Sequence, residues 1–541
     1  MRQISVSFLF AWAILGAKAA TATTVANITG PIVHLNYGSF QGNTTGTLDK
    51  FLGMPFAAPP VGNLRFAPPQ APLSFTGIRQ ATTFGTPCFQ QHLTTDNPPI
   101  SHVSEDCLFI NVIKPSNATG RKKLPVLMWI YGGGFEIGDT SFNPGDGVVT
   151  RSIALGEPVI YVSANYRASA LGFLAGKEVK DAGIGNAGMR DQRFAMEWVQ
   201  SHIESFGGDP SKVTIWGESA GAISVGLHFV VNNGNPNGLF HAAFMESGSP
   251  YHLRDITTFQ TQFDQLVADT GCTSALNKIT CLRGVPFTNL TAAINLSPDF
   301  FGFTSLSLAW QPSVDGEFFC LYAKVPFVSG DCDDEGTIFA MANLNITTNA
   351  EFLGYMKSNY FPNISDADLT ALGEAYPDDV TQGSPFDTGM MNALTPEYKR
   401  LAAIQGDLAF QAPRRFFLKR AMRTQPVYSF LFKRGKFAPN NTVGAAHQSD
   451  IPEFYGTGSS PDFIGTDALI NFANTHNPNL PKNSKSLLSK FEWPLYASSA
   501  THPPLFTFQD PPQVVNITFD TFRVEAMNLI NDITLRTGST V

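Results

Sequence analysis

The sequence predicts an α/β fold in which a mostly parallel central sheet is covered by helices on both faces, with large insertions. Short apolar runs typical of buried strands recur along the 541 residues, and helical stretches separate them. The runs cover residues 126–130, 159–162, 213–216, 242–245, 325–328 and 427–432. This alternation indicates a parallel sheet, because each parallel connection needs a crossover, which is usually a helix.

The clearest crossover helix lies between the second and third runs. Within residues 189–208, Met196, Val199, Ile203 and Phe206 recur at helical spacing, and the sequence FGGDPSK then ends the helix. No internal repeat, low-complexity tract or linker divides the chain. We therefore expect residues 20–541 to form one large catalytic domain.

The first residues have the features of a secretory signal peptide. One early arginine precedes an apolar stretch at residues 4–17, and small residues stand at Ala17 and Ala19. The stretch is too short to span a bilayer, so we expect cleavage after Ala19 and a soluble extracellular protein. Nine N-x-S/T sequons agree with a glycosylated surface. They begin at Asn27, Asn43, Asn117, Asn289, Asn295, Asn345, Asn363, Asn440 and Asn516.

The composition limits the partners of the protein. A net charge of −8 without Lys/Arg clusters argues against nucleic acid. The 45 phenylalanines are expected mainly in the core, but they also suit an apolar binding groove. Six cysteines in an oxidising compartment are expected to form disulfides rather than a metal site. The predicted pairs are sequence neighbours, Cys88 with Cys107 and Cys272 with Cys281, which leaves Cys320 and Cys332 as a third bridge or as buried thiols.

The sequence GESAG surrounds a candidate nucleophile, Ser219. An apolar strand precedes this serine, and small residues open a helix after it, which is the order of a nucleophile elbow. Gly217 and Gly221 suit such a turn, because a Cβ at either position would collide with nearby backbone. The alternative is an ordinary serine in a tight turn.

Three consecutive glycines at residues 132–134 follow another apolar run and predict an oxyanion hole. Backbone amides of such a loop can point at one spot that a substrate approaches closely. The amide of Ala220, directly after the candidate nucleophile, is the expected third donor. A flexible turn and a phosphate loop are the alternatives, but no Lys-Ser/Thr pair follows as a phosphate loop requires.

After a nucleophile elbow, the acid and then the histidine follow along the chain. Among the later histidines, three follow Ser219 too closely and two lie in surface-like sequence, which selects His447. Composition does not separate four candidate acids after the run at 325–328, and the three that are not catalytic are expected to form a solvated acidic turn. The four are Asp331, Asp333, Asp334 and Glu335.

These groups predict serine-hydrolase chemistry on esters. His447 would take the proton of Ser219, which attacks the carbonyl, while the loop amides stabilise the oxyanion and the acid fixes the imidazole tautomer. Water would then release the acyl group through the same base. This chemistry requires no metal and no organic cofactor.

Several motifs in this order resemble the type-B carboxylesterase/lipase family, in particular its fungal lipase and sterol esterase branch. They are GESAG, YGGGFEIG, SEDCLFINV, GNAGMRDQRFAMEWVQ, DDEGT and TQGSPFDTGMMNALTPEYKR. The resemblance covers essentially the whole mature chain, implies the α/β-hydrolase fold and matches both predicted cysteine pairs. It also implies a catalytic triad, three oxyanion donors and two aromatic residues of an acyl tunnel. The triad would consist of Ser219, Glu335 and His447, and the oxyanion donors would be Gly133, Gly134 and Ala220. The aromatic residues of the tunnel would be Phe339 and Phe410.

Three departures from the family pattern modify these expectations. The loop between Cys88 and Cys107, where these lipases carry their lid, is shorter here, which predicts weak interfacial activation and a more open site. The segment between VDGEFF and AKVPFVSG is also short and lacks what is usually a helix. Tyr131 stands where His or Phe is common, and we expect it to pack rather than to shape the pocket.

The favoured function is therefore a secreted hydrolase of apolar esters such as acylglycerols and sterol esters, in transient contact with lipid interfaces. A feruloyl or general carboxylesterase is the alternative, because a short lid would admit bulky substrates. A non-catalytic adhesion homologue is a third hypothesis, and the intact Ser219, Glu335 and His447 argue against it. A homodimer is a further hypothesis that no individual residue supports.

Overall fold

The computed structural model describes residues 30–93, 102–118, 122–231, 234–316, 323–458, 461–499 and 501–541. The predicted signal peptide, the sequon at Asn27, and Cys320 lie outside these ranges. None of the helices in the described ranges combines the length and the apolar character needed to cross a membrane.

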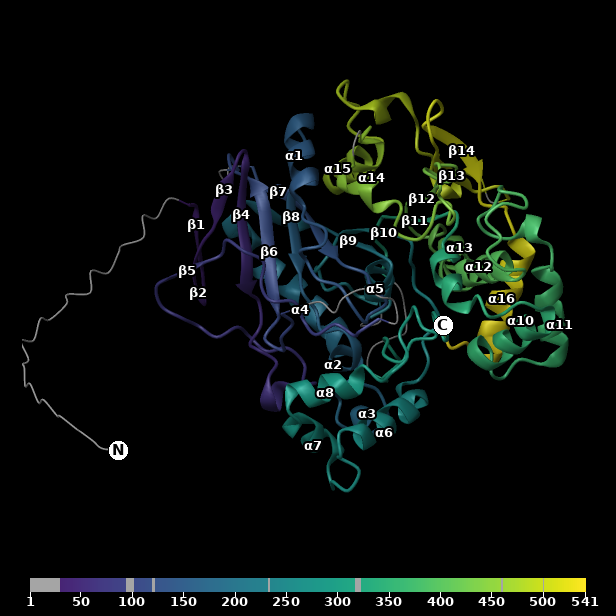
Figure 1. The fold of residues 1–541 in the computed structure, drawn as a ribbon. Helices are drawn as coiled ribbons and strands as arrows, with labels where there is room; N and C mark the ends of the chain where they lie inside the picture. Colours follow the sequence, from purple (N-terminus) through teal and green to yellow (C-terminus); the bar gives the residue numbers. More distant parts are fainter. Residues whose placement is uncertain are drawn as a thin grey trace, which may run out of the picture.

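Within the described residues, an eleven-stranded sheet runs through the molecule in the spatial order β14-β13-β12-β11-β10-β9-β7-β8-β6-β4-β3 (Figure 1). Neighbouring strands pair in parallel from β8 through β7 and β9 to β13. At the edges, the pairs β13–β14, β6–β8, β4–β6 and β3–β4 are antiparallel. The prediction of a mostly parallel sheet is therefore confirmed. The strands are β3 (Asn43–Thr45), β4 (Leu48–Pro55), β6 (Phe109–Pro115), β7 (Leu124–Ile130), β8 (Ile160–Ala164), β9 (Gly208–Glu218), β10 (Ala242–Glu246), β11 (Phe327–Cys332), β12 (Val427–Phe432), β13 (Pro504–Phe508) and β14 (Val515–Phe519). A small separate sheet contains β1 (Ile32–Leu35), β2 (Gly38–Gln41) and β5 (Ile78–Gln80).

Five of the six predicted strands differ from their observed bounds, and the starts of β9 and β11 differ for identifiable reasons. Strand β9 begins at Gly208 instead of residue 213, because Gly208 already pairs with Leu124 of β7 across a register shift. Strand β11 begins at Phe327, directly after Pro326, because proline has no N–H to donate to a neighbouring strand. Strand β11 also continues to Cys332, so Asp331 lies inside the strand and not after it.

Helices cover both faces of the sheet. The chain passes from β7 to β8 through α1 (Asp146–Leu155) and returns past β7 to β9 through α4 (Ala187–His202). Because parallel crossovers are right-handed, these two helices lie on opposite faces. Helix α15 (Ile464–Thr475) packs against α1, and α5 (Ala220–His228) packs on β9 and β10. The predicted crossover helix at 189–208 is thus α4 and the 3-10 turn that follows it.

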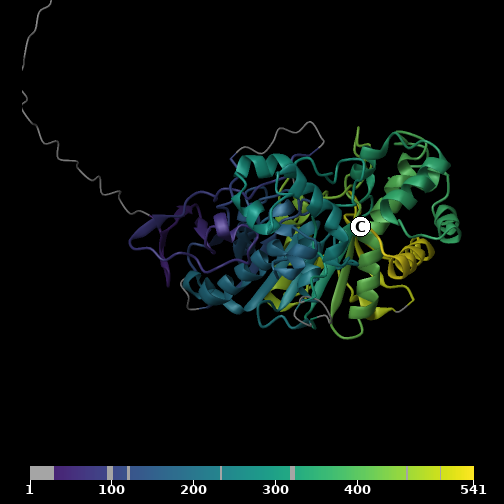
Figure 2. The same ribbon diagram turned by 90° about the horizontal axis from the view of Figure 1, so that it is seen from below.

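Further helices extend the molecule at one end of the sheet and carry an apolar core of their own, formed by α10, α12 and α16 with neighbouring segments. Figures 1 and 2 show these helices at the end opposite to the N-terminal strands. They are α9 (Thr337–Ala340), α10 (Asn349–Tyr355), α11 (Asp366–Ala375), α12 (Tyr398–Gly406), α13 (Ala412–Ala421) and α16 (Val524–Thr537). The remaining helices are α2 (Ser169–Phe173), α3 (Lys177–Asp181), α6 (Gln260–Asp269), α7 (Lys278–Gly284), α8 (Phe287–Ile294) and α14 (Ile451–Tyr455).

The predicted cysteine pairs are both present as disulfides, Cys88–Cys107 and Cys272–Cys281. Cys332, at the end of β11, is a free and fully buried thiol. Of the two states expected for Cys332, the structure therefore has the buried thiol.

Candidate active site

Ser219 occupies the sharp turn between β9 and α5. Its backbone has φ 56° and ψ −128°, and its amide donates to the carbonyl oxygen of Glu246 at 2.9 Å. A Cβ on Gly217 would lie 2.5 Å from a backbone carbon of Gly221, and one on Gly221 would collide with the carbonyl oxygen of Ile130. The two glycines therefore allow the close approach that a strained elbow needs.

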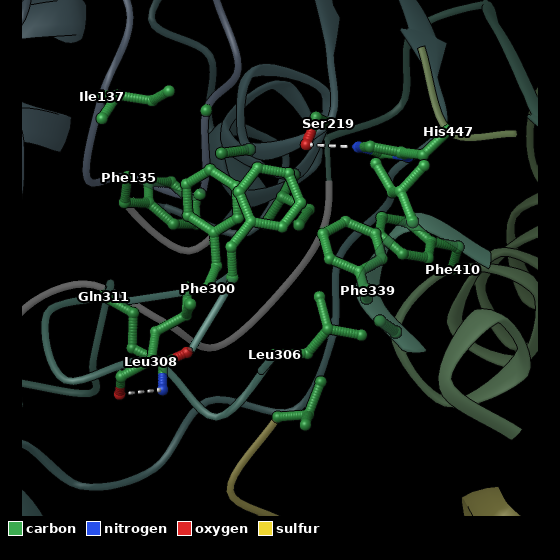
Figure 3. Close-up of a pocket in the computed structure, with 18 of the residues that line it drawn as sticks. Phe135, Ile137, Ser219, Phe300, Leu306, Leu308, Gln311, Phe339, Phe410 and His447 are labelled. Atoms are coloured by element: carbon green, nitrogen blue, oxygen red, sulfur yellow. Dashed lines mark hydrogen bonds between the residues drawn. The ribbon is translucent and has the colours of Figure 1, made fainter. Parts of the chain in front are cut away.

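His447 and Glu335 meet Ser219 from two other strand ends. Nε2 of His447 lies 2.8 Å from Oγ of Ser219 (Figure 3). Nδ1 of His447 lies 2.5 Å from Oε2 of Glu335. Glu335 stands in the turn after β11 and His447 in the loop after β12. Because β9, β11 and β12 run parallel, their carboxyl ends bring the three side chains to one edge of the sheet.

Burial sets the protonation of these groups. It lowers the pKa of His447 to about 4, an effect that Asp450 and Asp331 partly oppose. Burial raises the pKa of Glu335, and hydrogen bonds from Ser247 and from the amide of Cys332 oppose this shift by favouring the carboxylate. The neutral imidazole that a general base requires is therefore the favoured form at neutral pH.

The glycine loop after β7 borders the same space as Ser219. Gly133 and Gly134 have φ values of 103° and 62°, which glycine adopts readily. A Cβ on Gly134 would lie 2.6 Å from the ring of Phe300, so the residue is also fixed by packing. Both glycines line a pocket together with Ser219 and Ala220, the first residue of α5.

The rest of this pocket is mainly apolar and aromatic (Figure 3). Phe410 lies 4.6 Å from the His447 ring and stacks on Phe339, and Phe339 stacks on Phe301, with ring centroids 5.9 and 6.1 Å apart. Phe410 is part of a π-helical turn, Asp407–Gln411, between α12 and α13. Turns of this kind are frequent at functional sites because they displace a side chain from the regular helix pattern.

The expectation of a solvated acidic turn is wrong, because all three acids beside Glu335 are buried. Asp331 pairs with Arg414 at 2.8 Å, and Asp333 pairs with Lys436. Asp334 accepts the amide of Ala445 at 2.8 Å, two residues before the histidine of the site. These carboxylates therefore tie the Glu335 turn to neighbouring segments, and Asp334 ties it to the loop that carries His447.

Two buried carboxyls in the quoted motifs were not singled out from the sequence. Glu218 lies 3.3 Å from Nε2 of His447, and burial raises its pKa well above the ordinary range. Glu136 accepts the amide of Phe300 at 3.0 Å and so holds an aromatic wall of the pocket against the glycine loop. Glu218 could have been identified as a charged residue at the end of an apolar strand, and Glu136 as a charged residue directly after the glycine loop.

Other lining residues carried no sequence signal, because they come from irregular segments far from the motifs. They are Phe300, Phe301, Leu306, Leu308, Tyr251, Gln311 and Val541. Tyr131, in contrast, is buried against Tyr166 at a ring distance of 4.3 Å and does not line the pocket, in agreement with the packing role expected for it. No group of three or more His, Cys, Asp or Glu side chains in the described ranges is placed to hold a metal ion.

The sheet is mostly parallel, and a serine on a sharp elbow, a carboxyl and a histidine follow three of its strands. This arrangement defines the protein as an α/β-hydrolase. The model of the carboxylesterase family matches residues 29–525. The chain belongs to this family and is a carboxylic ester hydrolase.

Similar proteins cover nearly the whole chain. Lipase 2 of Diutina rugosa is 41% identical over 523 residues, which cover 90% of this chain and 92% of that protein. Secreted lipase 1 of Botryotinia fuckeliana is 39% identical, with coverages of 89% and 88%, and Lipase 1 of Geotrichum candidum is 34% identical, with coverages of 98% and 100%. The crystal structure of EstA from Aspergillus niger superimposes with a TM-score of 0.81 at 29% identity, covering 94% of this chain and 99% of that one.

Proposed function

We propose that Ser219 is the nucleophile, His447 the general base and Glu335 the acid of the catalytic triad. The observation that carries this proposal is the continuous contact from Oγ of Ser219 through the imidazole to the Glu335 carboxyl, at 2.8 and 2.5 Å. The serine also stands on a strained elbow, and the glycine loop lines the same pocket.

The reaction follows from these contacts. His447 removes the hydroxyl proton as Ser219 attacks the ester carbonyl, and Gly133, Gly134 and Ala220 donate their amides to the developing oxyanion. The imidazolium then protonates the leaving alcohol, which leaves an acyl group on the serine. Water, activated by the same imidazole, attacks this acyl-enzyme, and the free acid departs.

We propose apolar esters, including acylglycerols and sterol esters, as the substrates. Phe339 and Phe410 lie between the catalytic histidine and the apolar part of the pocket, where an acyl chain would bind. An apolar chain gains about 0.8 kcal/mol for each buried CH₂, so such a pocket favours long chains. Several relatives named as lipases support this assignment.

We propose further that the protein is secreted and glycosylated and that residues 20–541 form its single catalytic domain. The N-terminal leader sequence, the two disulfides and relatives named as secreted lipases support secretion. Among the sequons in described ranges, Asn43 is half-buried and the others are exposed, as glycan attachment requires. The exposed ones are Asn117, Asn289, Asn295, Asn345, Asn363, Asn440 and Asn516.

The test is a substrate panel. It compares kcat/KM for p-nitrophenyl esters from acetate to palmitate with rates on cholesteryl oleate, methyl ferulate, and tributyrin below and above its solubility limit. High rates on long chains and sterol esters, with little increase at the solubility limit, are expected for an apolar pocket under a short lid.

A preference for acetate or ferulate would overturn the substrate assignment. It would favour the feruloyl or general carboxylesterase and would mean that the phenylalanines of the pocket serve packing rather than chain binding.

A further inference from the structure

One pair of polar side chains lies in the otherwise apolar part of the pocket. Tyr251 and Gln311 line the same pocket as Ser219 and His447, and Gln311 is only 5% exposed. The Tyr251 hydroxyl donates to Oε1 of Gln311 at 2.9 Å. Figure 3 shows Gln311 on the far side of the drawn pocket from Ser219 and His447.

The amide nitrogen of Gln311 makes two long hydrogen bonds, which a closer acceptor can replace. Nε2 of Gln311 reaches the carbonyl oxygens of Leu308 and Thr540 only at 3.4 Å each, whereas an ordinary N–H···O bond measures about 2.9 to 3.0 Å. The Tyr251 oxygen still has lone pairs that can accept a hydrogen bond. Burial raises the pKa of Tyr251, so the hydroxyl stays protonated and keeps its bond to Gln311.

The position of the pair matters because no other polar side chain among the described lining residues lies at the far end of the pocket. The remaining polar side chains of the pocket, Ser219, His447 and Gln448, belong to the catalytic end. Leu306 and Leu308 lie around the far end. A hydroxyl buried among such side chains without a partner is strongly disfavoured, whereas one that donates to a phenol oxygen and accepts from an amide is not.

We propose that Tyr251 and Gln311 form a hydroxyl-binding subsite that selects esters of hydroxylated acyl groups. The substrate hydroxyl donates to the Tyr251 oxygen and accepts from Nε2 of Gln311. The inference rests on the proposed function, because it requires the acyl group to lie in this pocket. It adds a substrate class, the ω-hydroxyacyl ester, to the plain apolar esters.

The experiment measures kcat/KM for pairs of p-nitrophenyl esters, each an unsubstituted acyl chain and its ω-hydroxy counterpart, from six to sixteen carbons. The subsite lies at a fixed distance from Ser219, so the ratio of kcat/KM for the hydroxylated ester to kcat/KM for the plain ester is expected to peak at one chain length. At this peak the ratio should be about tenfold higher than for the shortest chains. Gln311→Met and Tyr251→Phe should remove the peak. Each ratio compares two esters on one variant, so a change in kcat/KM that is common to both esters cancels.

Leu306→Met is the matched control, since it changes an apolar lining residue and should leave the peak in place. Melting temperatures of all three variants establish whether they fold. If Gln311→Met does not fold, Tyr251→Phe, which removes a single oxygen atom, carries the test. A ratio without a maximum in the wild type, or a maximum that survives both substitutions, would overturn the subsite. Low rates on every plain ester would instead contradict the proposed function. The ratios of hydroxylated to plain ester would then still decide whether the subsite exists.

Discussion

The two ends of the pocket differ in how the chain builds them. At the catalytic end, Ser219, Glu335 and His447 follow three neighbouring parallel strands and are joined by short hydrogen bonds. The far end is assembled from side chains at residues 251, 300–311, 338–339, 409–410 and 541, held mainly by aromatic and apolar contact. From this difference we expect the chemistry to depend on a few fixed contacts and the choice of substrate to depend on the packing of the far end.

The strongest test of the catalytic end is Ser219→Ala. Loss of the nucleophile should lower kcat by about a million-fold, because the triad acts as a unit, while the melting temperature stays nearly unchanged. Ester hydrolysis and thermal unfolding measure the two effects. Ser224→Ala is the matched control, since this buried serine lies further along α5 and contacts Gln192, and it should retain activity within about threefold. Turnover that survives in the Ser219 variant would show that another group attacks the ester.

Gly134→Ala should produce the next largest effect. The added Cβ meets the Phe300 ring at 2.6 Å in a backbone conformation with φ 62°, so the amide is displaced from the oxyanion. Loss of one donor lowers kcat by about 100- to 1000-fold. Steady-state kinetics on one short ester measures the loss.

Gly156→Ala controls for the backbone effect. Gly156 has φ 81° and open space around its Cα, and it ends a helix away from the pocket. This variant should lose about 1 kcal/mol of stability and no activity. Equal losses of activity in both variants would mean that the glycine loop has no special part in catalysis.

At the far end, Phe301→Ala should alter selectivity rather than chemistry. The Phe301 ring packs on Phe300 and Phe339 at centroid distances of 4.6 and 6.1 Å, so its removal opens one wall of the apolar space. We expect kcat/KM for palmitate to fall about tenfold, with acetate changed less than threefold, because only the long chain reaches this wall. Phe303→Ala is the control, because Phe303 is 53% exposed and does not line the pocket. Equal losses on both esters would place Phe301 in the catalytic machinery.

The same contrast explains what could be predicted from the sequence. Ser219, the glycine loop and His447 lie in short motifs whose spacing is set by strand, turn and helix, so local rules and the family resemblance together identified them. Residues such as Gln311 and Phe301 reach the pocket only through the folding of irregular segments, which no local pattern encodes. The burial of Asp331, Asp333 and Asp334 was missed for a related reason, because their partners Arg414, Lys436 and Ala445 lie far along the chain.

The smallest expected effect is the response of activity to acid, and it tests how closed the catalytic end is. Burial holds the pKa of His447 near 4 instead of the ordinary 6.5, so the imidazole stays neutral well into acidic solution. The value of kcat/KM should therefore fall less than about twofold between pH 7 and pH 5.5 and decline steeply only near pH 4, whereas an ordinary histidine would lose about tenfold. Chromatographic measurement of the butyric acid released from tributyrin, with unfolding followed at each pH, separates titration of the base from loss of the fold. A midpoint near pH 6.5 with the fold intact would mean that water solvates the imidazole, and the catalytic end would then be as open as the substrate end.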